Sequence, residues 1–200
     1  MVVLLHGLGA NGADLLSLAP YWADSLPEAI FVAPDAPEAC DMAPFGYQWF
    51  SLQDRSFTAM EKGARNAAPL LNKFLDEQLT AHNVAADKLA LVGFSQGTMM
   101  ALFAAPRRHQ ALAAVVGYSG ALVAAAALAA ETKSKFPVLL VHGEVDSVVP
   151  FAAMGHAEEN LRSAGFNVTA LSRPGLGHSI DPEGLSAGAA FLRQSFTAKP

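Results

Sequence analysis

The sequence is poor in cysteine and in charged residues. It has one cysteine, Cys40, in 200 residues, so no disulfide can form within the chain, which is consistent with a cytoplasmic location. Only 16% of the residues are charged and 52% are hydrophobic, a composition that argues against intrinsic disorder. The length is typical of one hydrophobic core, and we expect a single domain over residues 1–200.

Basic residues are scarce as well. Lysine and arginine total 13 against 18 acidic residues, which gives a net charge of -5. Proteins that bind nucleic acids or anionic membrane surfaces need a basic face, so we expect neither a nucleic-acid partner nor stable membrane insertion. The apolar residues 1–5 are not preceded by a basic region, and the run ends at His6 and Gly7, so it is too short for a signal peptide.

The longest uncharged stretch, residues 111–130, is interrupted by the sequence Gly117, Tyr118, Ser119, Gly120. Alanine, its main residue, is only weakly apolar. We therefore interpret this stretch as a buried strand followed by an alanine-rich helix, and not as a transmembrane helix.

Short apolar runs alternate with helical patterns along the chain. The runs show no polar alternation, which is typical of parallel strands with helices on both faces. We predict a doubly wound α/β fold with a mostly parallel sheet of about six or seven strands. The first run begins at the first residue, so the sheet is expected to be trimmed at its N-terminal side, unless the sequence begins late. The predicted strands are residues 2–6, 30–34, 89–94, 114–118, 138–142 and 168–172, and the predicted helices are residues 14–23, 59–82, 96–105, 122–130 and 152–164.

Residues 40–58 are too long for a simple connection and are rich in aromatic side chains. Long loops in compact domains are usually functional, so we expect this segment to lie as an apolar wall or lid over the active site. The alternative is a satellite cluster that closes one edge of the core. The aromatic residues are Phe45, Tyr47, Trp49, Phe50 and Phe57.

Gly93, Phe94, Ser95, Gln96 and Gly97 match the pattern G-x-S-x-G between a predicted strand and a predicted helix. This is the context of the nucleophile elbow of α/β-hydrolases. The tight turn strains the serine backbone and exposes its hydroxyl, and the helix N-terminus favours developing negative charge. We therefore predict that Ser95 is a nucleophile.

A serine hydroxyl needs a general base, and four histidines follow Ser95. His178 lies in a glycine-rich loop after the last predicted strand, at the carboxyl edge of the sheet where ligands bind in open α/β folds. His142 ends an apolar strand and is expected to be packed or bonded to a turn. His109 is expected on a solvated helix end, and His156 on the helix of residues 152–164. His178 is the preferred base.

The third member of a triad orients the histidine and stabilises its cation. Asp146 follows the strand of residues 138–142, and the order serine, aspartate, histidine is that of α/β-hydrolases. Glu144 and Asp181 remain open as alternatives because both lie close in sequence to a preferred residue. An oxyanion hole needs two backbone amides. We expect these from Gln96, which follows the nucleophile, and from Leu8 in the loop after the first strand.

Together these segments resemble the carboxylesterase/phospholipase family of α/β-hydrolases, which includes acyl-protein thioesterases and small bacterial esterases. The matching segments are residues 5–10, 93–97, 119–120, 142–150 and 177–178. The resemblance implies the α/β-hydrolase fold, a Ser95, Asp146, His178 triad, and the Leu8 and Gln96 amides as the oxyanion hole. It also implies a serine carboxylesterase that needs no metal or cofactor and hydrolyses short- to medium-chain esters through an acyl-enzyme.

The resemblance extends to the substrate region. Tyr47, Trp49 and Phe50 stand in a stretch similar to the one that lines the substrate site of bacterial members, and Val148 is also expected to contact substrate. The partner would be a small-molecule ester, and the protein a monomer or a homodimer. Alternatives are an acyl-protein or acyl-CoA thioesterase or lysophospholipase, and, outside enzymes, an inactive ligand-binding member of the fold. Thr98 departs from the glycine usual in the family; its branched side chain is expected to tighten helix–strand packing or the pocket floor.

Overall fold

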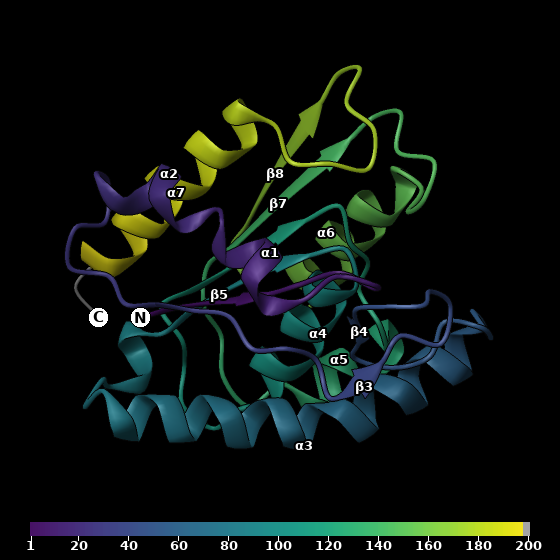
Figure 1. The fold of residues 1–200 in the computed structure, drawn as a ribbon, viewed down its shortest axis with the longest axis horizontal. Helices are drawn as coiled ribbons and strands as arrows, with labels where there is room; N and C mark the ends of the chain where they lie inside the picture. The colour runs from purple at the N-terminus through teal and green to yellow at the C-terminus, as the bar shows by residue number, and fades with distance from the viewer. Residues whose placement is uncertain (198–200) are drawn as a thin grey trace.

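A computed structural model describes residues 1–197 and contains a six-stranded sheet in the order β2-β1-β5-β6-β7-β8. Every strand pair in this sheet is parallel, and helices cover both faces (Figure 1). The prediction of a mostly parallel sheet is confirmed, and each predicted strand is present with small changes at its ends. The strands are β1 (Val2–Leu5), β2 (Phe31–Val32), β5 (Ala90–Phe94), β6 (Ala114–Tyr118), β7 (Val138–Gly143) and β8 (Val168–Arg173).

The unbroken apolar character of the strands follows from burial on both faces. In β1, Val2 and Leu4 belong to one hydrophobic cluster, whereas Val3 and Leu5 belong to the other. Successive side chains of a strand point to opposite faces, so a strand between two helical layers needs an apolar residue at every position. All four residues of β1 are fully buried, which places the strand inside the molecule.

One face of the sheet carries α3 (Phe57–Ala81), α4 (Gln96–Ala104), α5 (Ala125–Glu131) and α6 (Ala152–Ser163). Helix α3 is continuous over 25 residues, although Pro69 lies inside it. The buried residues of α3 recur at helical spacing, and they form the stripe that packs on the core. These residues are Ala64, Ala67, Ala68, Leu71, Leu75 and Leu79.

The opposite face carries α1 (Gly12–Leu16), α2 (Ala19–Ala23) and α7 (Pro182–Thr197) (Figure 1). Residues 14–23 were expected to form one helix and instead contribute to two short ones, and α7 was not predicted. Trp22 is fully buried, and its Nε1 donates to the Leu185 carbonyl at 2.9 Å. Tyr118 Oη donates to the Gly184 carbonyl at 3.0 Å. These two bonds fix α7 against α2 and β6.

Residues 40–58 contain part of a second, two-stranded antiparallel sheet, formed by β3 (Glu38–Ala39) and β4 (Tyr47–Gln48). The uncharged residues 111–130 contain β6 and most of α5, as the interrupted pattern predicted. Within residues 1–197, no helix combines the length and the apolarity needed to cross a membrane.

Candidate active site

Ser95 stands between β5 and α4 with φ 53° and ψ -116°, a backbone conformation that strains a residue with a side chain. Its amide donates to the Tyr118 carbonyl at 2.9 Å, which holds the turn against β6. The flanking glycines are required sterically. A Cβ on Gly97 would collide with the Leu5 carbonyl, and one on Gly93 would collide with the backbone of residues 97 and 98.

His178 and Asp146 lie on different loops at the carboxyl edge of the sheet and are hydrogen-bonded. His178 Nδ1 lies 2.8 Å from Asp146 Oδ2. The other carboxylate oxygen, Oδ1, accepts from the amides of Val148 at 2.8 Å and Val149 at 2.9 Å. The Asp146 side chain is fully buried and that of His178 is 17% exposed. The carboxylate is therefore held by the turn that follows β7, and the imidazole edge not bonded to it remains available.

The charge state of Asp146 follows from two opposing effects. Burial raises the pKa of the Asp146 carboxyl, because the charged form loses water. The hydrogen bonds from His178, Val149 and Val148 lower it and prevail, so the pKa of Asp146 lies below its ordinary value. Asp146 thus remains ionised at neutral and mildly acidic pH.

The other histidines after Ser95 take structural positions. His142 Nε2 lies 2.9 Å from the Val149 carbonyl and 3.3 Å from Asp146 Oδ2, so the prediction of a turn-bonded histidine is confirmed. The His142 ring thus lies near the same carboxylate oxygen that His178 contacts, a position that the sequence did not reveal. His109 is exposed and contacts Lys133, and His156 is exposed on α6.

The acids left open beside Asp146 do not contact His178. Glu144 is exposed. Asp181 Oδ2 is bound by Arg173 at 2.8 Å, and its Oδ1 accepts from the Gly184 amide in the first turn of α7 at 2.8 Å. Asp181 Oδ1 thus caps the N-terminus of α7. This structural role explains why an aspartate stands close to His178 without contacting it.

Phe94 connects the elbow to His178. The centroids of the two rings are 4.8 Å apart. Within residues 1–197, no direct hydrogen bond joins Ser95 to His178, and the observed contact is that of His178 with Phe94, the residue before the serine. Hydrogen bonds of this kind are often long in unliganded enzymes and shorten when substrate binds.

The amides of Leu8 and Gln96 lie on segments that contact each other. A Cβ built on Gly7 would lie 3.2 Å from Ser95 Cβ, so the loop after β1 reaches the elbow. Over residues 1–197, neither the Leu8 nor the Gln96 amide donates to another backbone group or to a side chain. Two unpaired amides beside the serine are an arrangement that can bind an oxyanion.

The aromatic segment divides into a buried and an exposed part. Trp49 and Phe50 are core residues; Trp49 Nε1 donates to the His6 carbonyl at 3.0 Å, and Phe50 packs on Gly63 of α3. Tyr47 and Val148 are 38% and 53% exposed and remain available to a ligand. The sequence could not separate the two groups, because aromatic content alone does not reveal which side of a loop faces the core.

Thr98 tightens the packing between α4 and β6. Its hydroxyl donates to the Tyr118 carbonyl at 2.9 Å, and the side chain is buried against Gly117 and Gly120. The glycines of β6 and of the following turn therefore provide the room that the branched side chain needs. This is the first of the two roles expected for Thr98.

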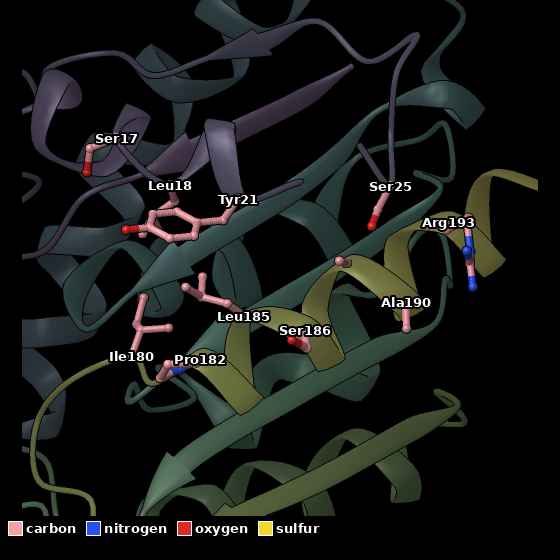
Figure 2. A pocket seen from close by; sticks show the side chains of 11 residues that line it. Ser17, Leu18, Tyr21, Ser25, Ile180, Pro182, Leu185, Ser186, Ala190 and Arg193 are labelled. Carbon is pink, nitrogen blue, oxygen red and sulfur yellow. The ribbon is translucent and has the colours of Figure 1, made fainter. Parts of the chain in front are cut away.

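A groove of about 600 Å³ lies between α2 and α7 (Figure 2). Tyr21 and Leu185 lie on opposite sides of it, and Arg193 is its one charged lining residue. None of the predicted site residues lines this groove. Among residues 1–197, no group of three or more histidine, cysteine, aspartate or glutamate side chains is arranged to hold a metal ion.

Several known proteins are similar to this chain over nearly its whole length. The sequence profile described as Phospholipase/Carboxylesterase matches residues 1–196. Esterase YpfH of Escherichia coli (strain K12) is 30% identical over 96% of this chain and 82% of its own length. Acyl-protein thioesterase 1 of Gibberella zeae is 27% identical over 99% of this chain and 91% of its own.

Solved structures show the same fold. The crystal structure of esterase PE8 superposes with a TM-score of 0.92 at 42% identity, over 96% of this chain and 91% of that one. Arabidopsis thaliana SOBER1, at 22% identity, gives a TM-score of 0.81 over 98% of both chains. With the profile extending over nearly all residues, the chain belongs to the phospholipase/carboxylesterase family of α/β-hydrolases.

Proposed function

We propose that Ser95, His178 and Asp146 are the catalytic triad of this serine hydrolase, which acts on carboxylic esters. The observation that carries the assignment is the 2.8 Å hydrogen bond between His178 Nδ1 and Asp146 Oδ2, made across two loops beside the strained elbow. It supports His178 and Asp146 over the other histidines and acids that the sequence offered. The complete set of groups argues against an inactive ligand-binding member of the fold.

The mechanism is a two-step acyl transfer. Ser95 Oγ attacks the ester carbonyl while His178 Nε2 takes its proton, and the Leu8 and Gln96 amides bind the oxyanion. His178 then gives the proton to the leaving alcohol, whose bond to the acyl carbon breaks. Water attacks the acyl-enzyme by the same route and releases the acid. Asp146 remains ionised throughout and holds His178 with the Nδ1 proton directed toward its carboxylate.

The acid-side pH dependence of kcat/KM is expected to report a single group, the general base of the mechanism. Because the pKa of Asp146 lies below its ordinary value, this carboxylate stays charged as the pH falls from 8 to 5. Burial lowers the pKa of His6 from its ordinary value, which favours the neutral form of this second buried histidine. Activity should therefore rise with pH along a limb of slope 1, because the mechanism requires one group, the general base, in its unprotonated form. A slope well above 1 in steady-state assays would mean that a second essential group titrates with it.

The reactive residue can be identified by covalent labelling. A fluorophosphonate probe should modify Ser95 and no other serine, as read by mass spectrometry of the peptide that contains it. The Ser95→Ala variant should take up no label. Labelling elsewhere, or none in the folded protein, contradicts the assignment.

The acyl group is proposed to be short to medium in length. Tyr47 and Val148 supply exposed apolar surface near the site, whereas Trp49 and Phe50 are occupied in the core. The relatives named acyl-protein thioesterase make hydrolysis of long acyl thioesters the second candidate. Measuring kcat/KM for esters and thioesters from two to sixteen carbons separates the two, because a thioesterase should prefer the longest chains.

The low positive charge and the single cysteine bear on the partners and the location of the protein. We propose a small-molecule ester as the partner, no nucleic-acid partner, and a monomer or a homodimer in the cytoplasm. The net charge of -5 and the single cysteine support these proposals. One domain spanning residues 1–200, with residues 40–58 beside the active site, is likewise proposed.

A further inference from the structure

The side chain of Gln96 joins the elbow to residues 46–50. Trp49 N donates to Gln96 Oε1 at 2.9 Å, and Gln96 Nε2 donates to the Phe50 carbonyl at 2.7 Å. Gln96 has no exposed surface, and both hydrogen bonds are buried. A buried amide that pairs with a donor and an acceptor of two consecutive residues fixes that piece of backbone, since an unpaired group would be costly there.

Residues 46–50 are also bonded to the loop that carries Leu8. Trp49 Nε1 donates to the His6 carbonyl at 3.0 Å. Tyr47 exchanges two bonds with the far end of the loop: Gly9 N donates to the Tyr47 carbonyl at 2.9 Å, and Tyr47 N donates to the Ala10 carbonyl at 2.8 Å. The Leu8 amide therefore lies between the attachment points of residues 46–50.

The close approach of the two segments has a steric requirement. Gly46 has φ +79°, and a Cβ there would collide with the Gly9 carbonyl. Residues 46–50 thus form a fixed bridge from the Gln96 side chain to residues 6–10, and their buried aromatic rings do not behave as a movable lid.

We propose that the Gln96 side chain is a positioning residue for oxyanion binding. It holds residues 46–50, which hold the Leu8 amide in place relative to the Gln96 amide. This inference rests on the proposed function, because it requires both amides to bind the oxyanion. One residue then contributes one donor through its backbone and positions the other through its side chain. Donors that are fixed beforehand need no reorganisation as negative charge develops.

The test is Gln96→Met, which keeps a side chain of similar length and removes both hydrogen bonds while leaving the Gln96 backbone amide. For a short-chain ester, kcat should fall by about 10- to 100-fold with KM within about twofold, since a displaced donor weakens the transition state more than the bound substrate. The rate constant for fluorophosphonate labelling should fall in parallel, because that reaction also develops charge on the oxygen bound by the two amides.

The matched control is Gln48→Met. Gln48 lies in the same segment and is 3% exposed, but only its backbone belongs to the bridge: its side chain accepts from Asp41 N at 3.0 Å and donates to Glu38 Oε2 at 3.1 Å. We expect Gln48→Met to lower the melting temperature and to leave kcat within about twofold. An equal loss of kcat in both variants would mean that Gln96 acts only through general stability, and the proposal would be wrong.

A second variant covers the case in which Gln96→Met does not fold. Trp49→Phe removes the Nε1 donor to His6 and keeps an aromatic ring in the core, and kcat should fall by about 3- to 10-fold at unchanged KM. Unchanged kcat in either folded variant, or a raised KM with normal kcat, overturns the proposal. Activity retained by Ser95→Ala would overturn the proposed function instead, so the two failures are distinguishable.

Discussion

Replacing Ser95 with alanine is expected to lower kcat/KM for a short-chain nitrophenyl ester by at least about 10⁴-fold. The change removes the one atom that forms the acyl-enzyme, so the covalent route is closed. Residual hydrolysis above the uncatalysed rate should remain, because the Leu8 and Gln96 amides still bind the oxyanion. Steady-state rates, measured at high enzyme concentration, give the residual value.

The fold should tolerate this substitution. The backbone at Ser95 has φ 53°, which strains alanine as much as serine. The hydrogen bond from the backbone N–H of residue 95 to the Tyr118 carbonyl is kept. The melting temperature should therefore change little, so loss of activity can be assigned to chemistry. A Ser95→Ala protein with activity near that of wild type would require a different nucleophile.

Replacing Asp146 with asparagine is expected to lower kcat by about 10⁴-fold. Asp146 Oδ1 accepts from the Val148 and Val149 amides, and the asparagine carbonyl must take that position. Its NH₂ group then faces His178 Nδ1 and donates to it. The imidazole is forced into the tautomer with its proton on Nε2, which cannot accept the proton of Ser95. The loss of kcat is therefore due to the position of the proton on the His178 ring, since the shape of the site is preserved.

Glu144→Gln is the matched control for this substitution. It also converts a carboxylate to an amide, two residues away, at an exposed side chain that does not contact His178. Its kcat should stay within about twofold of wild type. A large loss in Glu144→Gln together with a small one in Asp146→Asn would reverse the assignment of the acid. The tautomer of His178 in each variant can be followed by ¹⁵N NMR of the ring.

The strands and the elbow were predictable because their physical requirements are local. A strand between two helical layers must be apolar throughout, and β1, β5 and β6 are. Glycine is required on both sides of Ser95, because the Cβ of any other residue would collide with the neighbouring backbone. His178 and Asp146 could be predicted as candidate residues because each follows a predicted strand. Their pairing could not be derived from position alone, because Asp181 and Glu144 satisfied the same condition.

The unpredicted features depend on contacts between distant residues. Helix α7 was missed although its packing is specific: Trp22 and Tyr118 bond its backbone from two other parts of the chain. Trp49 and Phe50 were expected to contact substrate, and the structure places them in the core, with their backbone bonded to the Gln96 side chain. A glutamine in a short motif gives no indication that its side chain bonds a loop 46 residues away.

The loop between β8 and α7 is closed at its base by Arg173, which binds Asp181 and contacts Glu183. These ion pairs reduce the conformational freedom of the residues between them, and the Asp146 carboxylate then orients the imidazole. Within the loop, a Cβ on Gly177 would meet no atom within 4 Å. The position beside His178 can thus accept a side chain. A substitution at Gly177, natural or designed, can therefore change the acyl preference and leave the geometry of the catalytic groups unchanged.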